Sequence, residues 1–465
     1  MNNKKFVVSV VGMGYVGIPS AMAFASSKDV DFVYGIQRKS ERSKHKCDML
    51  NRGENPYPFD DLLGSFIKKY VEDEKFACGS DYRFINKCDA VCVCTQTPVD
   101  VCGSNIVPNY DSLKSALCSV ADNIKENTIV SIESTITPGS TDGWINELIS
   151  SRSGLSYEQY YLVHAPERVS PGRSLQNILQ IPRCVGGVDS RSTAKGVELY
   201  STVTKPENII RMTAREAEFT KVAENAVRDV QIATVNQLAM YCELLGINFN
   251  NVFRGIDSLK GRYITRSLLQ PGAGVGGHCL VKDGLHLEHS VNLENRWLYY
   301  GESFPSLFIA AREINDRMPL MVVQSLIGML VKQETRSKYR VAILGWAFSP
   351  DVDDDRNTPS YHFIKFLQRY GDISGIEFDI VVHDPHVKNP SYDVKVYQDI
   401  NFVLNDADVV VFMTKHNGYF GITPEYMEKA CHKKPIVIDG RNVAESDEYI
   451  EKGFKYYCIG RGDLR

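Results

Sequence analysis

Short runs of β-branched residues alternate with stretches of helical length in the first third of the chain, and the same alternation returns after residue 338. Between these two regions lies a long segment that has a helical period and lacks glycine and proline. Strands that alternate with helices predict parallel sheets with helices packed on them. The sequence therefore predicts an α/β protein with two Rossmann-like, doubly wound domains joined by a long central helix.

The segments of the first third are nearly continuous apolar strands separated by helix-length stretches. Such strands are typical of a sheet that is covered on both faces. The strand-like segments are KFVVSVVG (5–12), DFVYGI (31–36), CDAVCVCTQTP (88–98) and NTIVSIEST (127–135), and the helix-length stretch PSAMAFASS (19–27) follows the first of them.

Length, charge and cysteine content bound the class of protein. The 465 residues exceed what one core can serve, and we expect regions 1–210, 211–330 and 331–465. A formal net charge of −4 without a long basic run argues against nucleic-acid binding. Twelve scattered cysteines suggest reduced thiols rather than a disulfide framework, and no spacing predicts a metal site.

The apolar run that follows Lys5 could be mistaken for a signal peptide with a cleavage site near Ala25. Its glycines argue for a strand that passes into a helix instead. We therefore expect a soluble, cytoplasmic protein with no membrane partner.

The central segment from Thr213 to Tyr241 predicts one long helix. Its apolar side chains recur on one stripe, with polar residues opposite. The stripe consists of Phe219, Val222, Ala223, Ala226, Val227 and Val230. Because this surface could form the core of a dimer, we expect a homodimer or a larger homo-oligomer.

The last third repeats the α/β pattern without a glycine fingerprint. Its strand-like segments are KYRVAILGWAF (338–348), FDIVVHDPHV (378–387), ADVVVFMTK (407–415) and KPIVIDGRNV (434–443). A ligand of this region must therefore be bound without a glycine-rich phosphate loop.

The first strand runs into Gly12-x-Gly14-x-x-Gly17 at the start of a helix. These glycines permit a tight turn, a close approach of the backbone to a pyrophosphate, and packing of the helix on the strand. The helix N-terminus offers N–H groups to the phosphates. The motif predicts a dinucleotide site.

The carboxylate expected about 20 residues later, which would bind the ribose hydroxyls, is missing. The second strand ends in Gln37, Arg38 and Lys39. Gln37 can bind a hydroxyl, whereas the two cations suit a 2′-phosphate. NAD and NADP both remain open at this stage.

The segment PGAGVGGHCLVKD (271–283) surrounds Cys279 with glycines, which allow the backbone to approach a bulky substrate. A thiol at a helix N-terminus, one turn from Lys282, would have a pKa below its usual value of about 8.5. This favours a nucleophile over a buried structural cysteine. Cys92 and Cys94 alternate on a strand and are expected in the core.

Lys221 and Asn225 lie four residues apart on the face of the central helix opposite the apolar stripe. Such residues usually belong to a solvated face, here with Glu218 and Glu224 nearby.

The ordered motifs of the chain resemble those of the UDP-glucose/GDP-mannose dehydrogenase family, in particular its UDP-N-acetylhexosamine branch. His278 before the cysteine and the PERVSPG motif are typical of that branch. The motifs are GMGYVG, TQTPVD, ESTITPGST, APERVSPGRS, EFTKVAENAVRD, PGAGVGGHCLVKD, AREINDRMP and ILGWAFSPDVDDDRNTPS.

The resemblance implies an NAD-dependent, four-electron oxidation of a sugar C6 alcohol to a carboxylate, with UDP-N-acetylmannosamine as the favoured substrate. Lys221 and Asn225 would stabilise the developing oxyanion. Cys279 would capture the aldehyde, and Thr135, Glu167 and Asp283 would orient the hydrolytic water. The implied cofactor contacts are Gly12, Gly14, Tyr15, Val16, Gly17, Gln37, Arg38, Thr97, Pro98, Thr135 and Lys282.

Substrate contacts follow from the same resemblance. Arginine suits a pyrophosphate because its guanidinium can donate two hydrogen bonds at once. For Arg356, which lies beside three aspartates, a surface ion pair is nearly as good an interpretation. The implied contacts are Arg262, Gly274, Gly276, His278 and Arg356.

Two departures from the family pattern stand out. Ser349 replaces a common lysine, and the chain has Thr95-Gln96-Thr97-Pro98 where the motif usually reads V-P-T-P. Three alternatives stay open: a UDP-glucose 6-dehydrogenase, a two-electron hydroxyacid dehydrogenase that would not need Cys279, and a non-catalytic nucleotide-sugar sensor.

Overall fold

The computed structural model describes residues 5–57, 60–102, 105–169, 172–261, 268–293, 306–332 and 336–464. It contains two compact units. Unit 1 comprises Met1–Glu224 and Leu285–Ser303, and unit 2 comprises Asn225–Gly284 and Phe304–Arg465.

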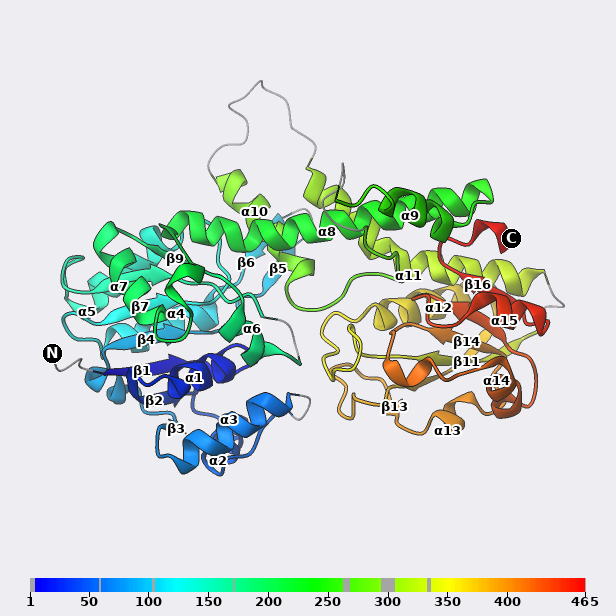
Figure 1. The fold of residues 1–465 in the computed structure, drawn as a ribbon. Coiled ribbons are helices and arrows are strands. Elements are labelled where there is room, and N and C mark those ends of the chain that lie inside the picture. The colour runs from blue at the N-terminus through cyan, green and yellow to red at the C-terminus, as the bar shows by residue number, and fades with distance from the viewer. Residues whose placement is uncertain are drawn as a thin grey trace, which may run out of the picture. The chain divides into compact units, whose positions relative to one another are not determined.

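Unit 1 is built on an eight-stranded sheet in the order β10-β9-β8-β7-β4-β1-β2-β3 (Figure 1). Its strands pair in parallel except for β8 with β9, which are antiparallel. The strands are β1 (Phe6–Val11), β2 (Val30–Ile36), β3 (Phe76–Gly79), β4 (Ala90–Val93), β7 (Ile129–Ile132), β8 (Tyr161–His164), β9 (Arg183–Gly187) and β10 (Ile209–Thr213).

Helices cover both faces of this sheet, as the doubly wound prediction requires. Two separate apolar clusters form, one on each face: the first includes side chains of α1, α3, α6 and α7, and the second includes side chains of α4 and α5. The helices are α1 (Gly17–Ser26), α2 (Glu41–Asn51), α3 (Asp61–Glu72), α4 (Asp111–Ala121), α5 (Asn146–Ser153), α6 (Ser174–Gln180) and α7 (Ser190–Tyr200). A separate antiparallel hairpin consists of β5 (Val99–Cys102) and β6 (Asn105–Pro108).

The apolar run after Lys5 is divided between β1 and α1, as its glycines predicted. No helix in the described part of the chain is long and apolar enough to cross a membrane. The expected reduced thiols have one exception among the described cysteines, because Cys47 on α2 is joined to Cys78 on β3 by a disulfide. These residues are distant in sequence, but β3 lies beside α2 in the fold, which brings the two sulfurs together.

The predicted central helix is α8 (Ala214–Leu245), which is slightly longer than expected. The apolar stripe is not buried as a whole: Val222 and Ala226 are buried, but Phe219 and Val227 are half exposed. The boundary between the two units falls within this helix, after Glu224.

Unit 2 contains a six-stranded, fully parallel sheet in the order β13-β12-β11-β14-β15-β16. The strands are β11 (Lys338–Leu344), β12 (Glu377–His383), β13 (Val396–Tyr397), β14 (Val409–Phe412), β15 (Ile436–Asp439) and β16 (Tyr456–Cys458).

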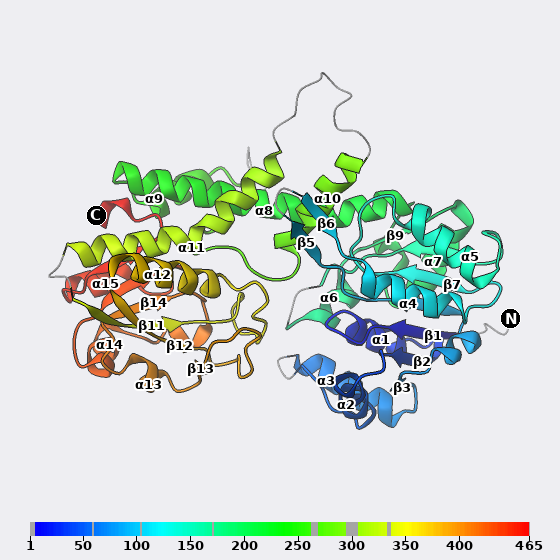
Figure 2. The ribbon, with the colours of Figure 1, turned by 180° about the vertical axis from the view of Figure 1, so that it is seen from behind.

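One face of this sheet packs on α9, α11, α12 and the end of α8, and the other on α13, α14 and α15. Figure 2 shows α11 and α12 lying side by side over the sheet. The helices are α9 (Phe249–Asp257), α10 (Leu280–Leu293), α11 (Leu307–Val331), α12 (Pro359–Ser374), α13 (Ile400–Leu404), α14 (Pro424–Cys431) and α15 (Ser446–Glu451); α10 begins in unit 2 and continues in unit 1.

Candidate functional site

The candidate dinucleotide site of unit 1 lies where four neighbouring parallel strands end. β1, β4, β7 and β8 are adjacent in the sheet, and each is followed by a segment that the sequence analysis singled out. In open α/β sheets, ligands bind in the crevice outside the carboxyl ends of the strands. The topology therefore gathers most of the predicted residues of the first domain at one edge.

The structure gives a different reason for the absence of a side chain at each glycine of the fingerprint. Gly12 has a φ of +96°, and a Cβ there would lie 2.6 Å from the carbonyl oxygen of Cys94. A Cβ on Gly17 would collide with the carbonyl oxygen of Gly12, because α1 begins so close to the turn. At Gly14 nothing lies within 4 Å of an added Cβ, so this position leaves space for a close approach by a ligand. This geometry fits a pyrophosphate at the N-terminus of α1.

The end of β2 carries an amide and cations, with no carboxylate. Gln37 donates from its side-chain amide to the carbonyl oxygen of Met13 (3.0 Å), so it braces the glycine loop. Lys46 on α2 donates to the hydroxyl of Tyr57 (3.2 Å), and burial, with the charge of Arg42, lowers its pKa. Tyr57 stacks on Tyr15 at 4.1 Å between ring centroids.

Arg38 is exposed at the end of the same strand.

The segments after β4 and β7 are linked to each other by a hydrogen bond. The hydroxyl of Thr97 donates to the carbonyl oxygen of Thr135, and Thr97 is buried whereas Thr135 is partly buried. Pro98 follows at the start of the β5 hairpin. Cys92 is buried in the core, as predicted, and the thiol of Cys94 donates to the carboxylate of Glu133 (3.2 Å).

A buried ionic network lies behind Glu167, and local sequence patterns did not reveal it. Arg183 forms ion pairs with both Glu167 and Glu133, and all three side chains are buried. Glu133 also accepts hydrogen bonds from Ser20 on α1 and from Tyr200 on α7. Burial raises the pKa of Glu167, and the charges of Arg183 and Lys221 only partly oppose this shift.

Lys221 is nine-tenths buried, which rules out a solvated face at this point of α8. Its charge lies close to the buried ring of His164 at the end of β8. Burial, together with Lys221, lowers the pKa of His164 to about 3. No described group is within hydrogen-bonding distance of either ring nitrogen of His164. His164 was missed because a single histidine in a strand carries no local signal of burial.

Glu218, which the helical pattern had placed near a solvated face, is fully buried. Its carboxylate accepts hydrogen bonds from the backbone N–H groups of Gly139 (2.6 Å) and Thr141 (2.7 Å), just after β7. Burial raises its pKa to about 7 in spite of these bonds.

In unit 2, Cys279 is exposed and stands immediately before α10. Its carbonyl oxygen accepts the N–H groups of Lys282 (3.1 Å) and Asp283 (2.9 Å), so it occupies the N-cap position. Lys282 forms an ion pair with Asp283 (2.9 Å), and the amide of Asn225 donates to the other carboxylate oxygen of Asp283 (2.5 Å). Asn225, Lys282 and Asp283 therefore form one connected group.

The glycines before Cys279 are explained by contacts with the protein itself. A Cβ on Gly276 would lie 2.6 Å from the carbonyl oxygen of Asn357, and a Cβ on Gly277 would lie 2.8 Å from the ring of Phe348. Gly274 has a φ of +115°, and its carbonyl oxygen accepts a hydrogen bond from Arg441 (3.0 Å). These glycines let the segment dock on the loop after β11.

The remaining predicted substrate residues have defined surroundings, except Arg262, which lies outside the described residues. Burial, followed by the charges of Lys282 and Arg356, lowers the pKa of His278 to about 4. Arg356 forms a two-pronged ion pair with Asp354, the pairing that the sequence had left as an alternative.

Comparison with known proteins identifies the architecture. The chain matches the UDP-glucose/GDP-mannose dehydrogenase family over the NAD binding domain (residues 6–204), the central domain (215–317) and the UDP binding domain (342–446). The chain belongs to this family. It is an oxidoreductase of the NAD-dependent UDP-sugar dehydrogenase class.

Similar proteins span almost the whole chain. The UDP-N-acetyl-D-mannosamine dehydrogenase of Pyrococcus horikoshii is 31% identical over 98% of this chain and 100% of its own length. The enzyme of the same name from Campylobacter jejuni is 29% identical over 91% and 98%. The crystal structure of an NDP-N-acetyl-D-galactosaminuronic acid dehydrogenase from Methanosarcina mazei Go1 is 42% identical, with a TM-score of 0.85 over 99% of this chain and 96% of that one.

The glycine loop allows a prediction that separates folding from cofactor binding. We expect Gly17→Ala to lower the melting temperature, since its Cβ meets the carbonyl oxygen of Gly12. Gly14→Ala should keep the melting temperature of the wild type but weaken cofactor binding by about tenfold or more, because its Cβ enters the space for the ligand. Thermal melts and cofactor titration measure the two effects. Equal melting temperatures and equal affinities in both variants would contradict the assignment of the loop.

The raised pKa of Glu218 predicts that the stability of unit 1 depends on pH. Its folded-state pKa of about 7 exceeds its unfolded value, so the free energy of unfolding should fall as pH rises from about 4.5 to about 7. The loss amounts to about 3 kcal/mol and should be absent in Glu218→Gln. Urea unfolding between about pH 5 and about pH 8, followed by hydrogen exchange in β7, reports on unit 1. Parallel pH profiles for the two proteins would contradict the prediction.

Proposed function

We propose that the protein oxidises the C6 alcohol of a UDP-N-acetylhexosamine to the uronate in a four-electron reaction that uses two NAD. One observation carries the proposal: among the cysteines whose burial the structure describes, which are all except Cys102, Cys279 is the exposed one, while the others are buried, partly buried or joined in the disulfide. A second oxidation at the same carbon needs a covalent anchor that keeps the reactive aldehyde in place. An exposed thiol at a helix N-terminus is suited to that task.

Each predicted residue takes one role in this proposal. Lys221 and Asn225 stabilise the oxyanion that develops on the substrate oxygen. Cys279 adds to the aldehyde to form a thiohemiacetal, and oxidation of that adduct gives a thioester. NAD, when bound, accepts the hydride in each oxidation. Thr135, Glu167 and Asp283 orient the water that hydrolyses the thioester, and the raised pKa of Glu167 suits it to accept a proton from that water.

The proposal divides the binding tasks along the chain. Residues 1–210 would bind the dinucleotide, residues 331–465 the UDP moiety, and residues 211–330 would supply α8 and Cys279. Arg262, Gly274, Gly276, His278 and Arg356 are the proposed substrate contacts. We also propose a homodimer or a larger homo-oligomer. Half-exposed apolar side chains on α8, such as Phe219 and Val227, support this proposal, and sedimentation velocity tests it.

Two epimers of the UDP-N-acetylhexosamine are candidates for the substrate. The sequence motifs favour UDP-N-acetylmannosamine, and curated relatives carry that name at 26–31% identity. The relative with 42% identity acts on the galacto series by its name, which makes UDP-N-acetylgalactosamine a second candidate. UDP-glucose serves as the third sugar in any comparison.

The function is tested by counting reduced cofactors per sugar consumed. We expect two per molecule of the preferred UDP-N-acetylhexosamine, and a lower rate with UDP-glucose. Cys279→Ala should lose sustained four-electron turnover by about a thousandfold or more, because the aldehyde is no longer captured. Cys458→Ala, which removes a buried thiol, is the matched control and should keep the two-to-one ratio. One reduced cofactor per sugar in the wild type would favour a two-electron dehydrogenase, and cofactor binding without turnover would favour a sensor.

The choice between NAD and NADP is predicted from the end of β2. NAD fits the NAD binding domain of the family, and the cations near Gln37 should allow NADP as well. Gln37→Asp should lower the ratio of kcat/KM for NADP to that for NAD by about tenfold or more, because a carboxylate repels a 2′-phosphate. Steady-state kinetics with both cofactors measure this ratio. An unchanged ratio would show that the end of β2 does not select the cofactor.

A further inference from the structure

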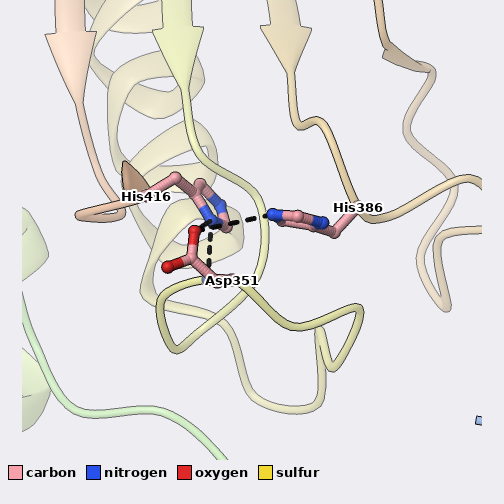
Figure 3. A group of neighbouring side chains, drawn as sticks. All are labelled: Asp351, His386 and His416. Carbon is pink, nitrogen blue, oxygen red and sulfur yellow. Dashed lines mark hydrogen bonds and ion pairs between the residues drawn. The ribbon is translucent and has the colours of Figure 1, made fainter. Parts of the chain in front are cut away.

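Three neighbouring strands of unit 2 end in a cluster of titratable side chains that the proposed chemistry does not use. β12, β11 and β14 are adjacent in the sheet. Asp384 and His386 follow β12, the loop of residues 345–358 follows β11, and His416 follows β14. Figure 3 shows Asp351, which belongs to that loop, with the rings of His386 and His416.

Asp384 anchors the start of the loop. One of its carboxylate oxygens accepts the backbone N–H groups of Trp346 (2.7 Å) and Ala347 (2.8 Å) together with the ring Nε2–H of His416 (3.0 Å). The other oxygen accepts the N–H groups of His386 and Val387. Burial alone would raise the pKa of Asp384, but these hydrogen bonds lower it to about 2. Asp384 is therefore an ionised acceptor.

His416 connects this anchor with Asp351 in the middle of the loop. The Nε2–H of His416 donates to Asp384, and the Nδ1 of His416 accepts the backbone N–H of Asp351 (2.9 Å), so Nδ1 carries the lone pair of the ring. Asp351 has a left-handed φ of +55°, and its Oδ1 accepts the N–H of Asn417 (3.0 Å). The fully buried His416 thus holds a strained residue of the loop in place.

The other end of the same loop touches the segment that carries the exposed cysteine. Gly277 donates its N–H to the carbonyl oxygen of Arg356 (2.9 Å), and the side-chain amide of Asn357 donates to the carbonyl oxygen of Gly277 (3.0 Å). The ring of Phe348 packs directly on Gly277, two residues before Cys279. Displacement of the loop would therefore displace the backbone next to the thiol.

A metal ion is the other role that this cluster could have, since one donor atom each of Asp351, His386 and His416 lies within 4.8 Å of the others. The hydrogen bonds argue against it. Both ring nitrogens of His416 and the Oδ1 of Asp351 already have partners in the protein, and a metal would have to displace two backbone N–H groups. The hydrogen bonds of the cluster therefore account for its arrangement without a metal ion, and we refer to it as a hydrogen-bonded clamp on the loop.

We propose that His416 is a positioning residue: through Asp351 and the loop of residues 345–358 it fixes the segment of Cys279, so that the thiol captures the aldehyde before it escapes. This inference rests on the proposed function. The loop also carries the proposed substrate contact Arg356, so a loosened loop would raise the KM for the sugar. At saturating sugar the first oxidation would proceed while capture by Cys279 is slowed, and part of the aldehyde would leave the enzyme.

The test measures how the sugar is partitioned between aldehyde and uronate. His416→Phe removes both hydrogen bonds of the ring while keeping an aromatic side chain. We expect the ratio of reduced cofactor to sugar to fall below two, with free aldehyde trapped by a hydrazine reagent, while the KM for the cofactor stays unchanged. His416→Asn keeps an acceptor for the N–H of Asp351 and should restore part of the ratio. A variant that merely folds less well would lose total activity without changing this partition.

The controls separate the possible failures. His362→Phe makes the same change at an exposed histidine on α12 and should keep the ratio of two. A ratio of one in the wild type would overturn the proposed function itself. A ratio of two in both the wild type and His416→Phe would overturn the positioning role alone. Release of aldehyde by the wild type after dialysis against a chelator would show that a metal holds the cluster, and would overturn the hydrogen-bonded clamp.

Discussion

The close packing of the glycine segment 272–277 on the loop after β11 is the constraint on which the second unit depends. Gly276 and Gly277 lie so near Asn357 and Phe348 that neither position has room for a Cβ. The thiol of Cys279 stays exposed even though the backbone before it is buried. A reactive group that is exposed on a rigidly held backbone is what covalent capture requires, because positioning lowers the barrier only when it is fixed in advance.

In the first unit a buried network of hydrogen bonds and ion pairs holds a proposed catalytic group in place. Glu133 receives hydrogen bonds from α1 and α7 and an ion pair from Arg183, and Arg183 also holds Glu167. Buried ion pairs contribute little net stability, but the loss of one partner leaves an uncompensated charge and costs about 3–5 kcal/mol. The network therefore couples the helix of the glycine loop to the carboxylate that we propose as the proton acceptor.

The sequence predicted those features that local patterns encode. Gly12, Gly14 and Gly17 specified a strand, a turn and a helix, and the structure has β1 and α1 at these positions. The prediction failed where partners come from distant segments. Glu218 was expected near solvent because helical spacing cannot show that Gly139 and Thr141 bond to its carboxylate. The glycines before Cys279 were explained by a bulky substrate, whereas Phe348 and Asn357 require them first.

The central claim is that Cys279 carries the sugar as a covalent thioester. It is tested most directly by acid quenching during turnover, followed by mass spectrometry of the peptide that contains Cys279. A Glu167→Gln variant, in which hydrolysis should be slowed, gives the intermediate time to accumulate. The account predicts that this peptide gains the mass of the nucleotide-sugar acyl group. Turnover to the uronate with an unmodified Cys279 peptide, in both the variant and the wild type, would contradict it.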